Sequence, residues 1–240
     1  MKKIDIHCHV LPGLDDGAHN IEESMQMLKM AKKQNICAVV ATPHYSNHFR
    51  NDKPEVIREL CRTLEQKARK EVDPHFRIFS GQENLASEDI LELLDKRKVL
   101  TLAGSSYVLM EFLPSTPYSN IFRTVQSLLL NQYQPILAHV ERYDVLREKG
   151  RIEELIEIGA TIQMNYRPIG GRWYDETTRW CRKMLKEGNV HLLGTDMHNT
   201  KARSPETADA EAWMEKHLDP SYVQEISYRN PLKIIKHEKI

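Results

Sequence analysis

Short apolar runs alternate with longer amphipathic stretches along the whole chain of 240 residues, and this order constrains the fold more than any other feature. Runs rich in β-branched, aromatic or leucine residues are typical of buried strands, whereas apolar residues three and four apart are typical of helices. We predict strands at 4–9, 37–42, 76–81, 107–112, 135–140, 160–165 and 190–195. We predict helices at 20–34, 54–71, 87–97, 118–132, 151–158, 175–187 and 205–217.

This repeated order predicts an α/β protein with a parallel sheet, either closed into a barrel or open and doubly wound. The first helix has Asn20 as a plausible cap with Glu22 and Glu23 in its first turn, and Pro54 opens the second. No Gly/Ser linker, low-complexity tract or sequence repeat interrupts the pattern. We therefore expect residues 1–240 to form a single domain.

Charge and hydropathy exclude several classes of partner. The 34 basic and 34 acidic residues cancel, which disfavours non-specific binding to nucleic acid or to an anionic membrane. The apolar runs are far shorter than the ~18–20 residues that span a bilayer. Asp5, His7 and His9 interrupt the segment that would be the apolar core of a signal peptide. We expect a cytoplasmic protein that does not insert into a membrane.

The cysteines exclude one large class of phosphatase. Cys8, Cys37, Cys61 and Cys181 lie far apart and include no Cys-x-x-Cys pair, so we interpret them as reduced thiols. None is followed six residues later by arginine, as a Cys-x5-Arg phosphate loop requires.

The predicted strands end in side chains that bind metals. With a period of two, Asp5, His7 and His9 share one face of the first strand while Ile4, Ile6 and Cys8 share the other, so two imidazoles converge on one point. Asp196 and His198 repeat the same spacing after the last strand, and the loop after the first strand adds Asp15 and Asp16, between which spacing does not choose. Burying such groups is costly without compensation. The candidate donors are His7, His9, Asp16, His44, Glu83, Glu111, His139, Asp196 and His198.

Nine donors are too many for one ion, so we expect two or three metals with bridging carboxylates, an arrangement used for hydrolysis and phosphoryl transfer. Nitrogen and oxygen donors without sulfur are compatible with manganese, iron or zinc. The spread of donors over many strand ends favours a barrel, because an open sheet concentrates its site at one switch point.

Two arginines closely follow donors. Arg142 comes three residues after His139 and Arg203 five residues after His198, and each is either a bidentate phosphate ligand or a surface ion-pair residue. The remaining histidines lack a strand-end position and are expected outside the site, although His48 lies close enough to His44 in sequence to line its entrance; they are His19, His48, His75, His191, His217 and His237.

Seven motifs in order resemble the PHP (polymerase and histidinol phosphatase) superfamily, and within it the bacterial capsule-type, manganese-dependent protein-tyrosine phosphatases. They are HisCysHis at 7–9, LeuAspAspGly at 14–17, ThrProHis at 42–44, GlyGlnGlu at 81–83, LeuMetGluPhe at 109–112, AlaHisValGluArgTyr at 138–143 and GlyThrAspMetHisAsn at 194–199. The resemblance covers essentially the whole chain.

The resemblance implies a distorted (β/α)7 barrel with a trinuclear Mn²⁺ site at the carboxyl ends of the strands, for which Fe, Zn, Co or Mg are possible substitutes. It carries over the nine donors as metal ligands, Arg142 and Arg203 as phosphate binders, and these arginines with Asp16 and His44 as catalytic residues. The family usually has prolines after the second arginine, whereas this chain reads LysAlaArgSerPro, so Lys201 is an alternative to Arg203.

The implied substrate is phosphotyrosine in the Tyr-rich C-terminal tail of a cognate bacterial tyrosine kinase, whose dephosphorylation controls capsule or exopolysaccharide synthesis. Hydrolysis is expected to be direct, with no phosphocysteine intermediate. One alternative is a PHP phosphoesterase acting on a small monoester such as histidinol phosphate. Another is a noncatalytic scaffold in which metal ions only stabilise the barrel.

Overall fold

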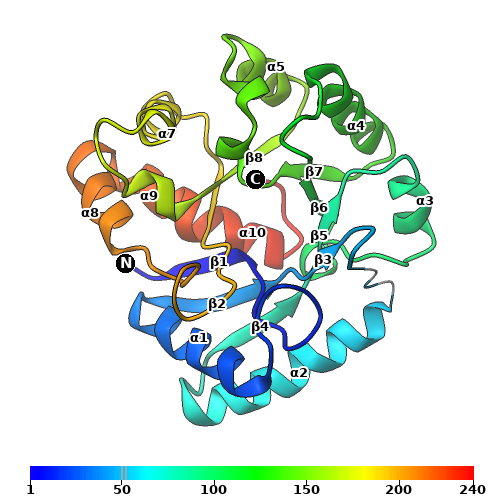
Figure 1. Cartoon of the computed structure of the whole chain (residues 1–240), viewed down its shortest axis with the longest axis vertical. Helices are drawn as coiled ribbons and strands as arrows, with labels where there is room; N and C mark the ends of the chain where they lie inside the picture. The colour runs from blue at the N-terminus through cyan, green and yellow to red at the C-terminus, as the bar shows by residue number, and fades with distance from the viewer. Residues whose placement is uncertain (50, 52) are drawn as a thin grey trace.

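Parallel strands and surrounding helices form the molecule (Figure 1). The computed structural model describes residues 1–49, 51 and 53–240. The strands are β1 (Lys3–Cys8), β2 (Ile36–Ala41), β3 (His44–Tyr45), β4 (Arg77–Ser80), β5 (Glu83–Leu85), β6 (Tyr107–Glu111), β7 (Gln134–Leu137), β8 (Thr161–Asn165) and β9 (Leu192–Gly194). The α-helices are α1 (Ile21–Lys33), α2 (Pro54–Glu71), α3 (Ile90–Asp95), α4 (Tyr118–Leu130), α5 (Arg151–Glu157), α6 (Tyr166–Ile169), α7 (Glu176–Lys186), α8 (Ala208–His217), α9 (Pro220–Gln224) and α10 (Asn230–Ile235).

The sheet curls until its first and last strands meet. The strand orders are β1-β2-β4 and β3-β5-β6-β7-β8-β9, and every pair is parallel. Because β3 continues the course of β2, and β5 that of β4, each of these pairs acts as one strand of the barrel. Cys8 at the end of β1 bridges to Met197, and Asp196 N donates to His7 O at 2.8 Å. These contacts confirm the distorted barrel of seven strand positions among the described residues and exclude an open, doubly wound sheet.

Apolar side chains fill the inside of the barrel and the layer between sheet and helices. Ile6, Val40, Leu109 and Ile136 belong to the inner cluster and are fully buried. On the outside, the predicted apolar face of α1 packs as expected, with Met25, Leu28 and Ala31 buried. The polar side chains at the carboxyl ends of the strands lie outside these apolar clusters.

The C-terminal segment closes the opposite end of the barrel. The red helix α10 crosses the barrel in Figure 1, and its Ile234 packs into the inner cluster. Ile240 N donates to the hydroxyl of Tyr107, the first residue of β6, at 2.9 Å. Our prediction assigned no element after residue 217, because α9, the π-turn Glu225–Arg229 and α10 are each five or six residues long and too short to show helical periodicity.

The strict alternation predicted for the first strand is wrong. Pairing between β1 and β2 shifts register between Asp5 and Cys8, and Ile6 and Cys8 consequently belong to different core clusters. Asp5 accepts hydrogen bonds from Thr195 N at 3.0 Å and Thr195 Oγ1 at 2.5 Å, and so ties β1 to the segment after β9. The irregularity is local, since the other predicted strands appear within two residues of their expected starts.

No helix in the described ranges has both the length and the apolar character needed to cross a bilayer.

The predicted cap at Asn20 is present and gives a first test. Its side chain accepts a hydrogen bond from Glu23 N at 2.9 Å. We expect Asn20→Ala to lower the free energy of unfolding by about 1 kcal/mol, because one N-terminal N–H of α1 loses its partner. Urea unfolding measures the change. The control is Gln26→Ala on the exposed side of α1, and an equal loss in both variants would contradict the assigned role of the cap.

Candidate metal centre

All nine candidate donors lie at the carboxyl face. His7 is on β1 and His9 follows it, His44 begins β3, Glu83 begins β5 and Glu111 ends β6. The other donors lie in loops. The donors that follow β7 and β9 do not continue the extended backbone of these strands. His139 and Asp196 have left-handed backbones, with φ of 33° and 52°, a conformation uncommon outside glycine and often found at functional sites. The strand geometry expected for Asp196 and His198 is therefore absent, because β9 ends at Gly194, although His198 Nδ1 still lies 3.5 Å from Asp196 Oδ1.

The first donor group consists of His7, His9, Glu83 and Asp196, all buried. Glu83 Oε2 lies 3.1 Å from Nε2 of both His7 and His9, and Asp196 Oδ1 lies 3.4 Å from His9 Nε2. An ion bonded at about 2.1 Å to such donors separates neighbouring ligand atoms by about 3.0 Å in an octahedron and about 3.4 Å in a tetrahedron. The observed spacings match the edges of such a coordination shell.

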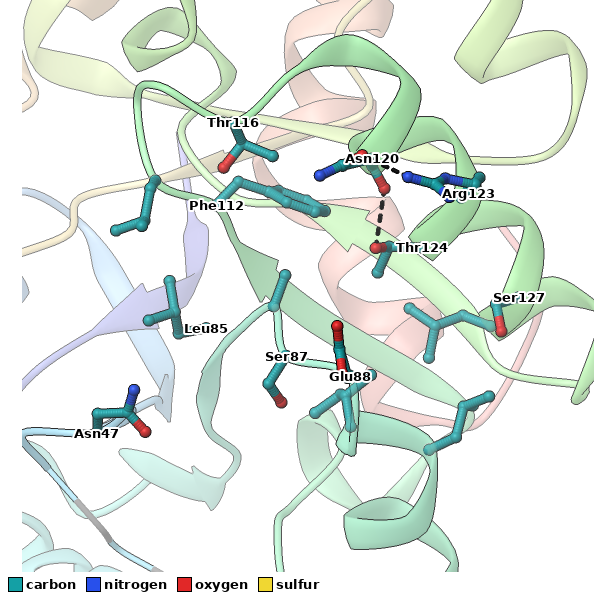
Figure 2. Close-up of a pocket in the computed structure, with 15 residues that line it drawn as sticks. Asn47, Leu85, Ser87, Glu88, Phe112, Thr116, Asn120, Arg123, Thr124 and Ser127 are labelled. Atoms are coloured by element: carbon teal, nitrogen blue, oxygen red, sulfur yellow. Dashed lines mark hydrogen bonds between the residues drawn. The ribbon is translucent and has the colours of Figure 1, made fainter.

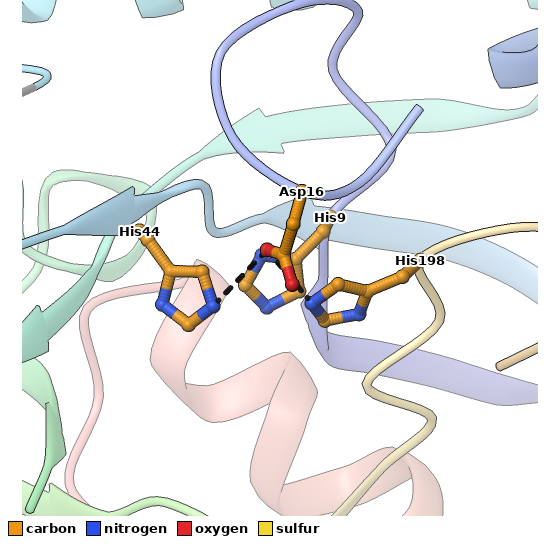
Figure 3. Close-up of side chains that lie close together, drawn as sticks. All are labelled: His9, Asp16, His44 and His198. Carbon is orange, nitrogen blue, oxygen red and sulfur yellow. Dashed lines mark ion pairs between the residues drawn. The ribbon is translucent and has the colours of Figure 1, made fainter. Parts of the chain in front are cut away.

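The second donor group consists of His9, Asp16, His44 and His198 (Figure 3). The Asp16 carboxylate lies between two of the rings in this view. Its Oδ1 is 3.5 Å from His44 Nε2 and 3.4 Å from His198 Nε2. Asp16 is half exposed, so this group forms the outer side of the centre.

The third donor group consists of His44, Glu83 and Glu111. His44 Nδ1 lies 3.2 Å from Glu83 Oε2 and 3.4 Å from Glu111 Oε2. His139 adjoins this group without belonging to it, since its Nε2 is 2.7 Å from Glu83 Oε1 and 3.6 Å from Glu111 Oε1. Any two of the three groups share one residue, so the groups form a continuous centre.

Unsatisfied atoms indicate that these groups are built for a cation. Glu83 Oε2, Asp196 Oδ1 and His198 Nε2 are buried and lack a hydrogen-bond partner within the described part of the chain. An orphaned buried polar atom costs ~1–3 kcal/mol, and more when it is charged. Metal ions bound at the first and second donor groups would satisfy all three, and the donor set therefore fits the metals that the sequence predicts.

The pKa shifts of the donors also indicate a site that binds positive charge. Burial lowers the pKa of His9, but the carboxylates of Asp15, Asp196 and Glu83 outweigh burial and raise it well above its usual value. Burial raises the pKa of Glu83, yet His7 and His139 hold it well below its usual range. The carboxylates thus stay ionised and require positive charge beside them, which protons or metal ions can supply.

A layer of hydrogen bonds behind the donors orients the rings. Asp15 Oδ2 lies 2.8 Å from His9 Nδ1 and accepts from His44 N at 2.9 Å, so Asp15 supports the rings while Asp16 joins the donors. Gln163 Oε1 lies 3.2 Å from His7 Nδ1 and accepts from His139 N at 2.6 Å. Bonds of this kind leave the opposite ring nitrogen free for a metal.

The sequence prediction missed this role of β8. The strand supplies none of the nine donors but provides Gln163 and Asn165, and Asn165 Nδ2 donates to Asp196 Oδ2 at 3.1 Å. The sequence signal that could have revealed this role is the pair of amide side chains two residues apart within the predicted strand 160–165.

Both predicted arginines reach the centre. Arg142 Nη2 and Arg203 Nη2 donate to the same oxygen, Asp196 Oδ2, the latter at 2.8 Å. Their side chains are 38% and 35% exposed, so both remain accessible from solvent. With Asp196 and Asn165 they line a pocket of about 460 Å³, which we call the arginine pocket, whereas Lys201 lines a neighbouring one.

The histidines expected outside the site do lie outside the three donor groups, and His48 is not in them either. His19 pairs with Glu23, His191 accepts from Ile162 N, and His217 stacks on Trp213.

A second open groove lies between α3 and α4 (Figure 2). It has a volume of about 550 Å³, and its walls include Leu85 and Phe112, which follow the donors Glu83 and Glu111 closely in sequence. Figure 2 shows Phe112 and Asn120 on one side of it and Ser87 and Glu88 on the other. None of the nine donors lines this groove, which extends from the residues after Glu83 and Glu111 along α4.

A parallel barrel with a nitrogen and oxygen donor centre at its carboxyl face has the architecture of a metal-dependent hydrolase. The chain belongs to the CpsB/CapC family of capsular polysaccharide synthesis, whose model matches residues 3–236.

Its relatives agree with this assignment. Over 218 residues it is 32% identical to the tyrosine-protein phosphatase YwqE of Bacillus subtilis, covering 89% of this chain and 84% of YwqE. Over 243 residues it is 32% identical to the tyrosine-protein phosphatase CpsB of Streptococcus pneumoniae, covering 99% of this chain and all of CpsB.

The fold agrees as well. The chain superposes with a TM-score of 0.89 and 29% identity on a crystal structure from the study of YwqE and CpsB, described as unique metal-dependent tyrosine phosphatases, over 99% of this chain and 96% of the other. The phosphotriesterase homology protein of Escherichia coli matches the fold alone, with a TM-score of 0.64 and 10% identity over 98% of both chains.

Tyr143 provides a test of how the donors are held. Its buried hydroxyl accepts from Phe112 N at 3.0 Å and lies 3.3 Å from His139 Nδ1. We expect Tyr143→Phe to lower the free energy of unfolding by about 1–3 kcal/mol, because both partners lose their contact without gaining water. Chemical unfolding measures it, with the exposed Tyr174→Phe as the matched control, expected to stay within about 0.5 kcal/mol. Equal stability of the two variants would contradict this account.

Proposed function

We propose that this protein is a metal-dependent tyrosine-protein phosphatase of capsular or exopolysaccharide synthesis, with the whole chain forming the catalytic domain. One observation carries the proposal: a buried donor centre with orphaned atoms lies beside two accessible arginines that share one carboxylate oxygen. The relatives named above are tyrosine-protein phosphatases, and this supports the choice of substrate.

In this proposal the nine donors would hold three Mn²⁺ ions, one for each donor group, and His139 would add to the third group. His9, His44 and Glu83 each belong to two of the three donor groups. This sharing supports three ions that lie next to one another rather than at independent sites. Iron, zinc, cobalt and magnesium suit similar donors and are the substitutes to test. Bound ions would supply Lewis acidity, making water a stronger nucleophile and neutralising charge on the phosphoryl group.

The protein's own residues bind and orient the phosphate. Arg142 and Arg203 are accessible and present guanidinium groups that fit phosphate oxygens bidentately. Asp196 pairs with both and holds them side by side. Asp16 and His44 lie on the outer side of the centre, where they position the incoming phosphate and the attacking water. A phenolate leaving group, with a pKa of ~10, needs less protonation than an alkoxide.

The finer biological assignment rests on the family. We propose that the physiological substrate is the Tyr-rich C-terminal tail of a cognate bacterial tyrosine kinase, dephosphorylated in the cytoplasm. The arginine pocket is open, and a second open groove is lined by Phe112 next to the donor Glu111, which supports a polypeptide substrate over a small metabolite. The described cysteines are unpaired, as in a reducing compartment.

The first experiment measures activity and metal content together. Metal-stripped protein is reloaded with Mn²⁺, Fe²⁺, Zn²⁺, Co²⁺ or Mg²⁺ and assayed on a phosphotyrosine peptide, a phosphoserine peptide and histidinol phosphate, with vanadate as a probe. We expect Mn²⁺-dependent turnover, selective for phosphotyrosine and poorly sensitive to vanadate, with three ions per chain by elemental analysis.

The matched variants are Glu111→Gln, which removes a donor carboxylate, and Glu88→Gln, which removes an exposed one in the neighbouring groove. The first should lose turnover while remaining folded, and the second should keep it. Preference for histidinol phosphate would move the protein to the metabolite phosphoesterases, and no turnover with any metal would favour the scaffold.

A cysteine-free variant tests the absence of a phosphocysteine intermediate. Burial raises the pKa of Cys61 to about 12 and that of Cys8 well above its usual value, so neither is a thiolate at neutral pH. We expect Cys8→Ala, Cys37→Ser, Cys61→Ala and Cys181→Ala together to keep most of the turnover of a folded protein, as judged by circular dichroism. Removing a nucleophile would instead lower kcat on the order of 10⁴–10⁶-fold, and such a loss would refute direct hydrolysis.

A further inference from the structure

Two large aromatic side chains are exposed in the loop between α6 and α7. Trp173 is 75% exposed and Tyr174 is 54% exposed. Their rings meet edge to face, with centroids 5.8 Å apart. Arg172 supports the pair, since its Nη1 donates to the Tyr174 hydroxyl at 2.6 Å. An exposed aromatic pair is a frequent mark of a binding surface.

The loop is pinned at its first end by glycines that have no room for a side chain. A Cβ on Gly170 would lie 2.7 Å from Asp209 Cβ of α8, and a Cβ on Gly171 would lie 2.1 Å from Thr178 Oγ1 of α7. Arg182 donates to the carbonyls of Ile169 and Gly171, each at 3.0 Å. The backbone is thus clamped against two helices immediately before the aromatic pair.

The second end of the loop is fixed as well. Asp175 caps α7, and its Oδ1 accepts from Thr178 N at 2.8 Å. Between the clamped glycines and this cap, only Arg172, Trp173 and Tyr174 project. A backbone held at both ends loses less conformational entropy when a partner binds. This rigidity favours a role of the loop in recognition.

The position of the loop links it to the candidate centre. It follows β8 and so belongs to the carboxyl face. Pro168 before the aromatic pair and Asp175 after it line the arginine pocket together with Arg142 and Arg203. The pair therefore lies in a short segment whose two flanking residues line the pocket that would receive the phosphate.

We propose that Trp173 and Tyr174, the aromatic ledge, dock the polypeptide that carries the phosphotyrosine by packing against an apolar or aromatic side chain next to it. This inference rests on the proposed function and adds a specificity surface to it. A small monoester held by the arginine pocket does not extend to the ledge. Only a substrate with flanking residues gains from it, so the ledge separates protein substrates from metabolites.

The test compares two phosphotyrosine peptides that differ only beside the phosphotyrosine, one with Leu and Phe and the other with Gly and Ser, with phenyl phosphate as the small substrate. The variant is Trp173→Ala/Tyr174→Ala in the full, Mn²⁺-loaded chain. The matched control is Leu130→Ala, which removes a 78% exposed apolar side chain from the C-terminal end of α4. All replaced residues are exposed, and thermal unfolding verifies that the variants fold.

We expect wild type to prefer the apolar peptide, and the double variant to lose about tenfold in kcat/KM on that peptide alone. Its kcat/KM on phenyl phosphate should be unchanged, and Leu130→Ala should behave as wild type. An equal loss on phenyl phosphate, or no loss on the apolar peptide, would overturn the inference. So would a dimeric wild type that the double variant converts to a monomer without any change in peptide kinetics, because the ledge would then join two copies of the chain. Wild type that hydrolyses no phosphotyrosine substrate would instead refute the proposed function.

Discussion

The need to place positive charge beside buried carboxylates governs this structure. Glu83 and Asp196 lie almost fully inside the barrel, and each keeps one oxygen without a hydrogen bond in the described part of the chain. Such groups persist only when cations or protons compensate them. Imidazoles from β1, from the loops after β1, β7 and β9 and from the start of β3 surround these two carboxylates, so the arrangement of the carboxyl face follows from this one electrostatic requirement.

The strands of the barrel contribute different kinds of side chain to the centre. Most strand positions contribute metal-type donors, while β8 contributes the amides of Gln163 and Asn165, which hold donors from behind. The chain that follows β8 then borders the arginine pocket and carries the aromatic ledge. In the proposed function, chemistry and recognition would therefore come from neighbouring parts of one barrel, with rigid strands fixing the donors and loops contacting the substrate.

Most of the fold could be predicted because its signals are local. The period of each apolar run, the Asn20 cap and Pro54 at the start of α2 depend on nearby residues, and the elements appear where expected. The errors arose where tertiary contacts override local pattern. Pairing with β2 shifts the register of β1, the left-handed backbone of Asp196 ends the extended geometry assumed there, and the short C-terminal helices are stabilised by packing under the barrel.

The sequence by itself determined the chemistry of the site, because His, Asp and Glu at successive strand ends have donor properties that do not depend on distant residues. It also determined the parallel α/β order. Only the tertiary structure decided that Asp16 joins the donors while Asp15 supports His9, and that Arg203 rather than Lys201 meets Asp196. These choices depend on the direction in which each side chain points once β1 meets the end of β9, and that closure joins residues nearly 190 positions apart.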